Sequence, residues 1–327
     1  MVREKINIGT LELKSRIVMP PMATGLSTED GTVTDALLDF YSIRAENPNI
    51  SMIITEHSYI TMQGKARTGQ MSIASDGDIE GLSRLTECIH KYGIKAVAQL
   101  NHAGSAAFSK VTGMEIVSAS PVILPTSPMM GDGTVPKTLS KDEIKGIAEA
   151  FAFAAGRAKK AGYDGVEIHS AHAYLLNQFY SPLSNYREDE YGGSLENRLR
   201  IHKEIIEAVR AEVGTDYLIA LRLGGSDYMR GGNTIEDAVC AARLLESYGI
   251  DMLDLSGGMC RYTRKDHSEP GYFQDMSYAV RKAVEIPVML TGGIKTIAEA
   301  DKLLEDHAAD LIGVGRELLK NAAWETE

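Results

Sequence analysis

Short runs of apolar, often β-branched residues recur along the chain, and longer stretches with helical spacing separate them. A short run that is apolar on both faces is typical of a strand in a parallel sheet covered by helices. The sequence predicts eight such strands, at 16–22, 50–57, 95–102, 164–169, 217–225, 252–258, 286–293 and 309–315.

Helical patterns lie between these strands, for example at 78–93, 141–162 and 234–249. Several begin with Ser, Thr or Asp and an acidic first turn and end at glycine, which are physical start and stop signals of helices. Eight alternating units predict an α/β fold of the (β/α)8 TIM-barrel type, and the leading "INIGTLELKS" predicts a short hairpin that closes its bottom.

A doubly wound sheet split into two domains is the alternative fold. Neither a Pro/Gly/Ser-rich linker nor a shift of composition marks a boundary, so we predict one barrel domain over residues 1–327. Three connections are long, at 103–139, 170–195 and 259–274. Long loops in a compact domain are usually functional, and in a barrel we expect them on the C-terminal face.

Composition narrows the function classes. The 327 residues are 44% hydrophobic and 24% charged, which is ordinary for a globular protein, and the net charge of −11 argues against a nucleic-acid partner. Cys88, Cys240 and Cys260 are isolated from one another, which fits a reducing compartment. The sequence shows no signal peptide and no apolar run of membrane-spanning length, so we expect a cytoplasmic protein without a membrane partner.

Polar residues stand where the predicted strands end. They are His57, Gln99, His102, His169, Arg222 and Ser256, and His172 and Tyr174 follow closely after the fourth strand. A single histidine at a strand end is usually a structural hydrogen-bonding group. Several on one rim favour a functional site, since the last residue of each barrel strand points toward the active site.

One interpretation of these histidines is a metal-dependent barrel hydrolase, because histidine is the commonest metal ligand. The sequence speaks against it. The first strand ends in "MPPMAT" without a histidine pair, and the eighth ends in "GVGRE", where such a hydrolase would need a ligand or a carboxylate base.

A second interpretation starts from the glycines after the last two strands. "TGG" (291–293) precedes a helix that opens at Thr296, and "GVGRELL" (313–319) runs directly into a helix. Glycine lets backbone N–H groups approach an anion, and the loops after strands seven and eight are where barrels bind phosphate. With Arg316 as a charged contact, the sequence predicts a phosphate at this position.

The segment "HSAHAYLLNQFYSPLSNYREDEYGGSLENRLR" (169–200) resembles the signature region of the old yellow enzyme family, the flavin-dependent NAD(P)H oxidoreductases and ene-reductases. "RIVMPPMATG", "AQLNHAG", "RLGGSD" and "LIGVGRELL" match that family in order, so the resemblance covers about 16–319. It implies a bound FMN, reduction by NADH or NADPH, and transfer of hydride to an activated C=C bond of an enone, quinone or enoyl-type substrate.

The resemblance also implies roles for individual residues. Those that would contact FMN are Pro21, Met22, Ala23, His57, Gln99 and Arg222, and those that would hold its phosphate are Gly292, Gly293, Gly315 and Arg316. His169 and His172 would donate hydrogen bonds to the substrate oxygen, and Tyr174 would protonate the α-carbon.

Two departures from the family pattern stand out. Ala23 occupies a position that commonly carries Thr or Cys and tunes the flavin, and Thr24 is the residue that could compensate. "MATGL" is similar to the 2,4-dienoyl-CoA reductase branch, whose members add a cysteine-rich iron–sulfur segment that is not found before "NAAWETE". We therefore expect electrons directly from a nicotinamide or from an electron-transfer partner protein; a homo-oligomer and a non-catalytic flavin-binding subunit stay open as alternatives.

Overall fold

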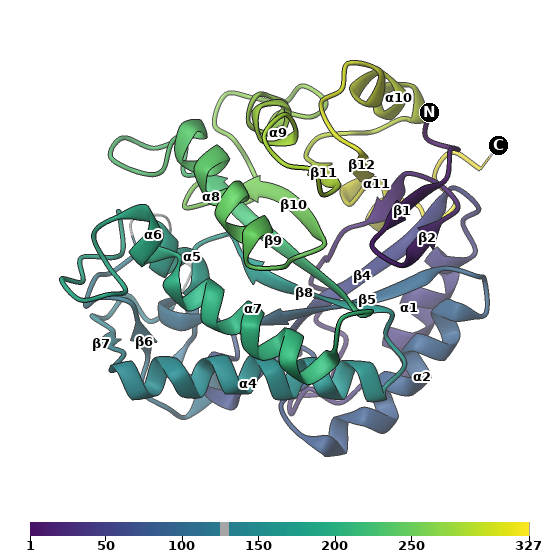
Figure 1. Ribbon diagram of the computed structural model, residues 1–327. Helices are drawn as coiled ribbons and strands as arrows, with labels where there is room; N and C mark the ends of the chain where they lie inside the picture. Colours follow the sequence, from purple (N-terminus) through teal and green to yellow (C-terminus); the bar gives the residue numbers. More distant parts are fainter. Residues whose placement is uncertain (125–130, 327) are drawn as a thin grey trace.

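The computed structural model describes residues 1–124 and 131–326, and its centre is a closed barrel of eight parallel strands. In barrel order the strands are β3 (Ile17–Met19), β4 (Ile50–Tyr59), β5 (Lys95–Asn101), β8 (Gly165–Ser170), β9 (Leu218–Ser226), β10 (Met252–Gly257), β11 (Val288–Thr291) and β12 (Leu311–Gly313). β12 pairs with β3 and closes the ring (Figure 1). The predicted barrel is confirmed, and the doubly wound alternative is wrong.

Some predicted strands extend beyond the observed ones, and backbone chemistry explains where the observed strands end. The first strand stops at Met19 because Pro20 and Pro21 have no N–H to donate to the sheet. The seventh stops at Thr291 because Gly292 turns the chain with a φ of 145°. The apolar pattern thus predicts the buried middle of each strand, while local residues such as Pro20 and Gly292 decide where a strand ends.

A hairpin closes the bottom of the barrel, as the sequence predicts. β1 (Ile6–Ile8) pairs antiparallel with β2 (Leu11–Leu13). Ile8 and Leu13 are buried in an apolar cluster that fills the lower interior of the barrel. The other buried members of that cluster are Val18, Met52, Ile54, Val97, Leu218, Ala220, Met252, Met289 and Leu311.

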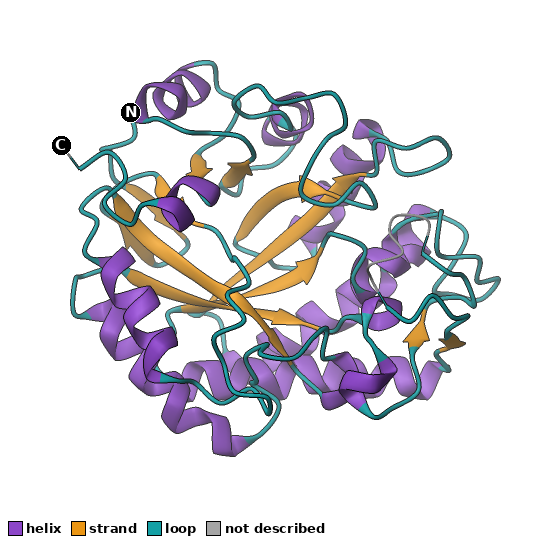
Figure 2. Ribbon diagram, turned by 180° about the vertical axis from the view of Figure 1, so that it is seen from behind, coloured by secondary structure: helices purple, strands orange, loops and turns teal. Residues whose placement is uncertain are grey.

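Helices cover the outside of the barrel (Figure 2). The main ones are α1 (Asp35–Ala45), α2 (Ile79–His90), α4 (Lys141–Lys160), α7 (Arg200–Val213), α8 (Ile235–Ser247), α9 (Gln274–Arg281) and α10 (Ile297–Glu305). α4 shows how the sequence sets them: Ser140 and Glu143 form a capping box at its start. Its apolar side, with Ile144 and Phe151, is buried against the sheet in the main core.

Shorter elements lie in the long loops at the C-terminal face of the barrel. The loop after β5 holds α3 (Ser109–Thr112) and the small parallel pair β6 (Val117–Ser118) and β7 (Lys137–Thr138); its residues 125–130 lie outside the described chain. After β8 come α5 (Leu175–Tyr180) and α6 (Leu195–Arg198), and α11 (Arg316–Lys320) follows β12. Of the helices that the structure describes, none combines the length and apolar character needed to span a bilayer.

Candidate active site

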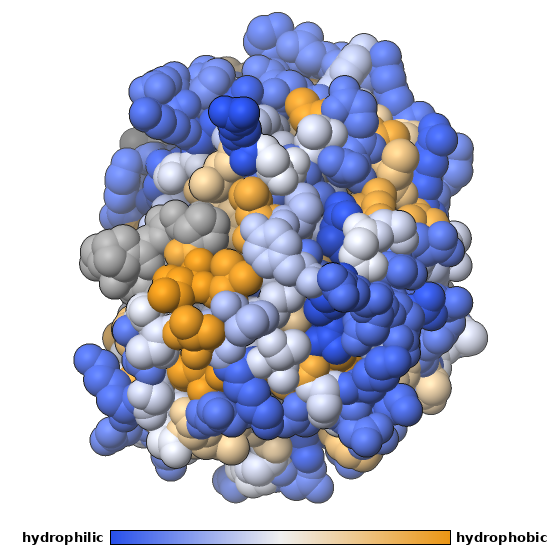
Figure 3. Space-filling model, turned by 90° about the vertical axis from the view of Figure 1, so that its left-hand side faces the viewer, coloured by the Kyte–Doolittle hydropathy of each residue, from blue (hydrophilic) through white to orange (hydrophobic). Residues whose placement is uncertain are grey.

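A cavity of about 620 Å³ opens at the C-terminal face of the barrel. All thirteen residues for which the sequence predicts a catalytic or FMN-binding role line it. They are Pro21, Met22, Ala23, His57, Gln99, His169, His172, Tyr174, Arg222, Gly292, Gly293, Gly315 and Arg316. Figure 3 looks onto this side of the molecule, where hydrophilic residues cover most of the surface and an apolar patch lies on one flank.

The chain turns sharply after β8, and this turn places two histidines and a tyrosine together. His172 and Ala173 both adopt left-handed backbone angles, with φ of 60° and 63°. Non-glycine residues rarely take this conformation, and such strain is concentrated at functional sites. The Ala173 amide donates to Asn177 Oδ1 at 2.8 Å and fixes the turn. As a result His169, His172 and Tyr174 all line the cavity.

Four aromatic rings form one wall. The His169 ring lies 5.2 Å from that of His172 and 5.1 Å from that of Tyr174, centroid to centroid. The His57 ring lies 5.3 Å from Tyr174 and 6.3 Å from His169. Burial, reinforced by nearby positive charge, lowers the pKa of all three histidines, that of His57 to about 3. The imidazoles are therefore neutral near pH 7, and each carries one N–H.

His57 is oriented by two amides. Its Nδ1 accepts from Gln70 Nε2 at 2.8 Å and from Asn101 Nδ2 at 3.2 Å, since an amide nitrogen can only donate. The proton of the neutral ring consequently sits on Nε2. The sequence predicted His57 as a flavin contact, and the structure adds that its ring also packs on Tyr174.

His172 has a partner on a neighbouring strand. Its Nε2 lies 2.7 Å from the Ser256 hydroxyl on β10, and its backbone amide donates to the Gly257 carbonyl at 3.3 Å. Ser256, predicted among the strand-end residues, does not line the cavity but orients a residue that does.

A charged layer lies at the base of the cavity. Gln99 Nε2 donates to Glu167 Oε1 at 2.7 Å, and Arg222 Nε lies 3.0 Å from Asp254 Oδ2 in a buried ion pair. The pair lacks hydrogen-bond geometry, and Glu167 Oε2 also has no hydrogen-bond partner in the part of the chain that the structure describes. Burial raises the pKa of Glu167 well above its usual value and that of Asp254 to about 6, with Arg222 opposing both. Arg222 thus holds a fixed positive charge beneath the cavity.

The two glycine loops differ in how their helices begin. α10 has a complete capping box, in which the Glu299 carboxylate accepts from the Thr296 amide and the Thr296 hydroxyl from the Glu299 amide. α11 begins at Arg316 after Gly315 without a side-chain cap. The backbone N–H groups at the start of α11 therefore have no side-chain acceptor among the described residues, unlike those at the start of α10. The Arg316 guanidinium donates to the Tyr272 hydroxyl at 3.0 Å and lies at the rim of the cavity.

Besides Ser256, two more residues considered from the sequence lie outside the cavity. His102 is buried, and its Nδ1 accepts from the Gly104 amide at 3.1 Å, so it has a structural role in the loop after β5. The Thr24 amide donates to Glu56 at 2.9 Å, and its hydroxyl accepts from the Leu26 amide at 3.1 Å. Thr24 therefore does not replace the side chain that Ala23 lacks.

Several residues of this site were not predicted from the sequence. Glu167 and Asp254 had a readable signal, because each is a lone acid inside an otherwise apolar strand, "GVEIH" and "MLDLS". Arg67, Arg261 and Tyr262 come from loops without periodicity and gave no such signal, although all three line the cavity.

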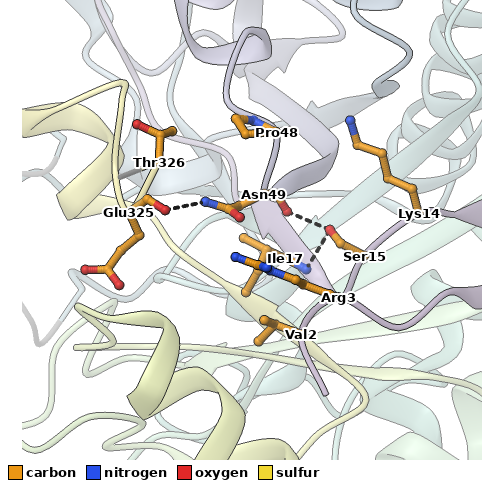
Figure 4. Close-up of a pocket in the computed structure, with 9 residues that line it drawn as sticks. All are labelled: Val2, Arg3, Lys14, Ser15, Ile17, Pro48, Asn49, Glu325 and Thr326. Atoms are coloured by element: carbon orange, nitrogen blue, oxygen red, sulfur yellow. Dashed lines mark hydrogen bonds between the residues drawn. The ribbon is translucent and has the colours of Figure 1, made fainter.

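A second, smaller cavity of about 340 Å³ lies at the opposite end of the barrel, near the starts of β3 and β4 (Figure 4). Asn49 Nδ2 donates there to the Glu325 carbonyl at 2.9 Å, and the Ser15 hydroxyl donates to the Asn49 carbonyl at 2.6 Å. These bonds tie the chain ends together and leave no converging reactive groups. Residues 1–124 and 131–326 also contain no cluster of three His, Cys, Asp or Glu side chains suited to a metal ion.

Comparison with known proteins bears on this site. The model of the NADH:flavin oxidoreductase / NADH oxidase family matches residues 4–327. The chain is 38% identical over 323 residues to an NADH oxidase of Thermoanaerobacter brockii, with 97% of this chain and 49% of that protein covered. It is 39% identical to an NADPH dehydrogenase of Clostridium acetobutylicum, with 97% and 91% covered. The chain thus spans about half the length of the first relative and about nine-tenths of the second.

Solved structures agree with this similarity. The old yellow enzyme homologue from Zymomonas mobilis superimposes with a TM-score of 0.86 at 31% identity, over 98% of this chain and 90% of that one. The resemblance inferred from residues 169–200 and the barrel strands is therefore confirmed.

Proposed function

Since the chain belongs to the NADH:flavin oxidoreductase / NADH oxidase family, we propose that it is an FMN-dependent enzyme that takes hydride from NADH or NADPH and reduces the activated C=C bond of an α,β-unsaturated carbonyl compound or a related acceptor. The observation that carries this proposal is the convergence of His169, His172 and Tyr174 on one wall of the mouth cavity, within 5.2 Å of one another along the ring contacts.

The cavity fits FMN. Its volume lies within the range of small-molecule sites, roughly 300–1,000 Å³. Gln99 and Arg222 at its base would meet the polar edge of the flavin ring, and the uncapped start of α11 with Arg316 would hold the phosphate. Bound FMN would supply the two-electron hydride chemistry of the reaction.

The residues of the chain would supply binding and proton transfer. The neutral imidazoles of His169 and His172 would donate N–H groups to the carbonyl oxygen and stabilise the negative charge that develops on it. Tyr174, as a neutral phenol, would deliver a proton to the α-carbon. Burial raises the pKa of Tyr174, which keeps its proton in place until the substrate requires it.

An anaerobic titration tests the proposal. We expect NADH or NADPH to bleach the visible band of FMN-loaded protein, and an enone to restore the band with one equivalent of the saturated carbonyl product. A flavin that neither nicotinamide reduces would indicate a non-catalytic flavin-binding subunit. A reduced flavin that quinones reoxidise while no enone is converted would limit the function to electron transfer.

The metal-dependent hydrolase is no longer supported. The family match and the old yellow enzyme neighbour point to flavin chemistry, and the His169 ring lies against that of Tyr174 and not against a carboxylate of the kind that a hydrolase centre needs.

A further inference from the structure

The mouth cavity is strongly cationic although the chain as a whole carries a net charge of −11. Only one acid, Glu317, is found among its described lining residues. The basic ones are Arg67, Arg222, Arg261, Lys295, Arg316 and Lys320. The proposed FMN site accounts for Arg222 and Arg316, while Lys295 and Lys320 adjoin the phosphate loops. Two arginines, Arg67 and Arg261, are left without a role.

These two arginines approach the ring cluster from opposite sides. Arg67 lies in the connection from β4 to α2 and Arg261 in the connection from β10 to α9, and three strands separate β4 from β10 in either direction around the barrel. Their charges nevertheless converge. After burial, which raises the pKa of Tyr174, Arg67 and Arg261 are the neighbours that lower it.

Neither guanidinium forms an ion pair with a described residue, although Glu56 is near enough to Arg67 for the arginine to lower its pKa. Within residues 1–124 and 131–326, no salt bridge or side-chain hydrogen bond involves Arg67 or Arg261, and Arg261 Nε is buried without a partner. Arg264 lies three residues further along the same loop and forms an ion pair with Asp275 at 2.8 Å. The isolation of Arg261 is thus a local feature and not a property of the loop.

The backbone around Arg261 is constrained. Arg261 has a left-handed φ of 67°, and its amide donates to the Gly258 carbonyl at 2.9 Å. Its guanidinium lies 5.4 Å from the centre of the Tyr262 ring, and that ring lies 5.9 Å from the ring of His172. A strained conformation at a non-glycine residue persists only where the surrounding structure enforces it. The arrangement keeps Arg261 beside the cavity wall that His172 and its neighbouring rings form.

We propose that Arg67 and Arg261 form an anion subsite above the rings of His57, His172 and Tyr174, and that the preferred oxidant carries a carboxylate or a comparable anionic group apart from its reducible bond. Unpaired guanidinium groups bind carboxylates through charge-assisted, often bidentate hydrogen bonds. A cationic cleft in an acidic protein also concentrates anions at its mouth. This inference rests on the proposed function, because it names the substrate class for the same site.

A pair of ligands that cannot be reduced tests the subsite without turnover. 3-(4-Hydroxyphenyl)propanoate and its amide, 3-(4-hydroxyphenyl)propanamide, share a phenol for the histidine pair and differ only in the charge of the flexible arm. We expect the carboxylate to bind the oxidised FMN-loaded protein about tenfold more tightly, measured from the perturbed flavin spectrum, and this preference to shrink at high salt. Equal affinities, or no binding of either ligand, would overturn the proposal.

Variants locate the effect. Arg67→Met and Arg261→Met should each lower the preference several-fold, and the double variant should abolish it while the affinity for the amide changes less than about twofold. Arg67→Lys and Arg261→Lys should retain part of it, because they keep the charge and lose the fork. Arg3→Met, at the opposite end of the barrel, is the matched control and should leave it unchanged. A double variant that keeps the full preference would refute the assignment.

The phosphates of the reductant are the other anions that could use this subsite. We expect the double variant to slow reoxidation by a carboxylate-bearing oxidant by a larger factor than it slows reduction by NADH or NADPH. If instead NADPH reduction collapses and the carboxylate preference survives, the subsite belongs to the reductant and the proposal is wrong. Absence of enone turnover with an intact carboxylate preference would reject the proposed C=C chemistry alone, so the two failures are distinguishable.

Discussion

The ring of Tyr174 lies against that of His57, with centroids 5.3 Å apart and planes inclined by 36°. His57 belongs to strand β4 and Tyr174 to the turn after β8, and Gln70 and Asn101 fix the His57 ring through its Nδ1. The phenol of Tyr174 is thus held from β4 as well as by its own turn after β8. This restraint limits the positions that the Tyr174 phenol can take in the cavity.

Replacing Tyr174 by phenylalanine separates the two half-reactions. The ring packing stays and the acid is removed, so reoxidation by an enone should slow by about 10²–10⁴-fold, the usual contribution of general acid catalysis. Flavin reduction by NADH or NADPH should change by less than about threefold, because it needs no proton donor at carbon. Stopped-flow measurements of both half-reactions check this. Equal slowing of both would assign Tyr174 a structural role.

The histidine pair should bind phenolates. We expect p-hydroxybenzaldehyde to give a long-wavelength charge-transfer band with the oxidised FMN-loaded protein, since two N–H donors stabilise a phenolate stacked on the flavin. The double variant His169→Ala, His172→Ala should lose this band and retain FMN. His202→Gln serves as the control, because His202 lies outside the cavity against the Ser170 hydroxyl. Loss of FMN from the double variant would contradict the assignment.

Arg316 should contribute to retention of FMN. Arg316→Ala removes one charge-assisted contact to the phosphate, which is worth about 1.5–3 kcal/mol, and should weaken FMN binding by about ten- to a hundredfold. Fluorescence of FMN released on dialysis measures this. Arg243→Ala, an exposed change at the Ala283 carbonyl, should have no effect. Full FMN occupancy of the Arg316 variant after extensive dialysis would refute the phosphate site.

Buried neutral histidines should make the fold sensitive to acid. Burial lowers the pKa of His57 and His202 to about 3 and that of His102 to about 4, below the ordinary value of 6.5. Between pH 6.5 and these values the unfolded chain binds protons that the folded chain cannot. The histidine contribution to stability is therefore complete above pH 6.5 and is lost as the pH falls, by about 1.4 kcal/mol per pH unit for each differential proton.

Urea unfolding at a series of pH values measures this slope. His202→Gln should flatten the slope by about one proton without changing the cavity. The raised pKa of Asp254, about 6, acts in the opposite sense, because its contribution is present at low pH and lost as the pH rises through that value. Equal slopes below pH 6.5 for the His202→Gln variant and the unmodified protein would show that His202 is not held neutral.

Much of the fold was predictable because apolar runs and helix caps are both local features of the sequence. The run 165–170 is buried on both faces, and Ser140 with Glu143 caps a helix whatever the rest of the chain does. Strand-end residues such as Gln99 and Arg222 could be placed at the cavity because barrel topology brings every strand end to one face.

The rest depends on tertiary contacts without a sequence pattern. Arg67 and Arg261 come from irregular loops on opposite sides of the barrel, and only the closed ring of strands brings their charges toward one tyrosine. The left-handed backbone of His172 and Ala173 could not be predicted either, because neither residue type strongly favours that conformation.

The hairpin at the bottom of the barrel has a kinetic consequence. Ile8 and Leu13 seal the lower interior with side chains that are each 1% exposed, and the ligand cavity opens at the opposite, C-terminal face of the barrel. A nicotinamide and an oxidant that both need the same flavin face must then take turns. We expect double-displacement kinetics with parallel reciprocal plots, and each substrate at high concentration should obstruct the other. The β1–β2 hairpin thereby leaves one face of the barrel at which the two substrates bind in turn.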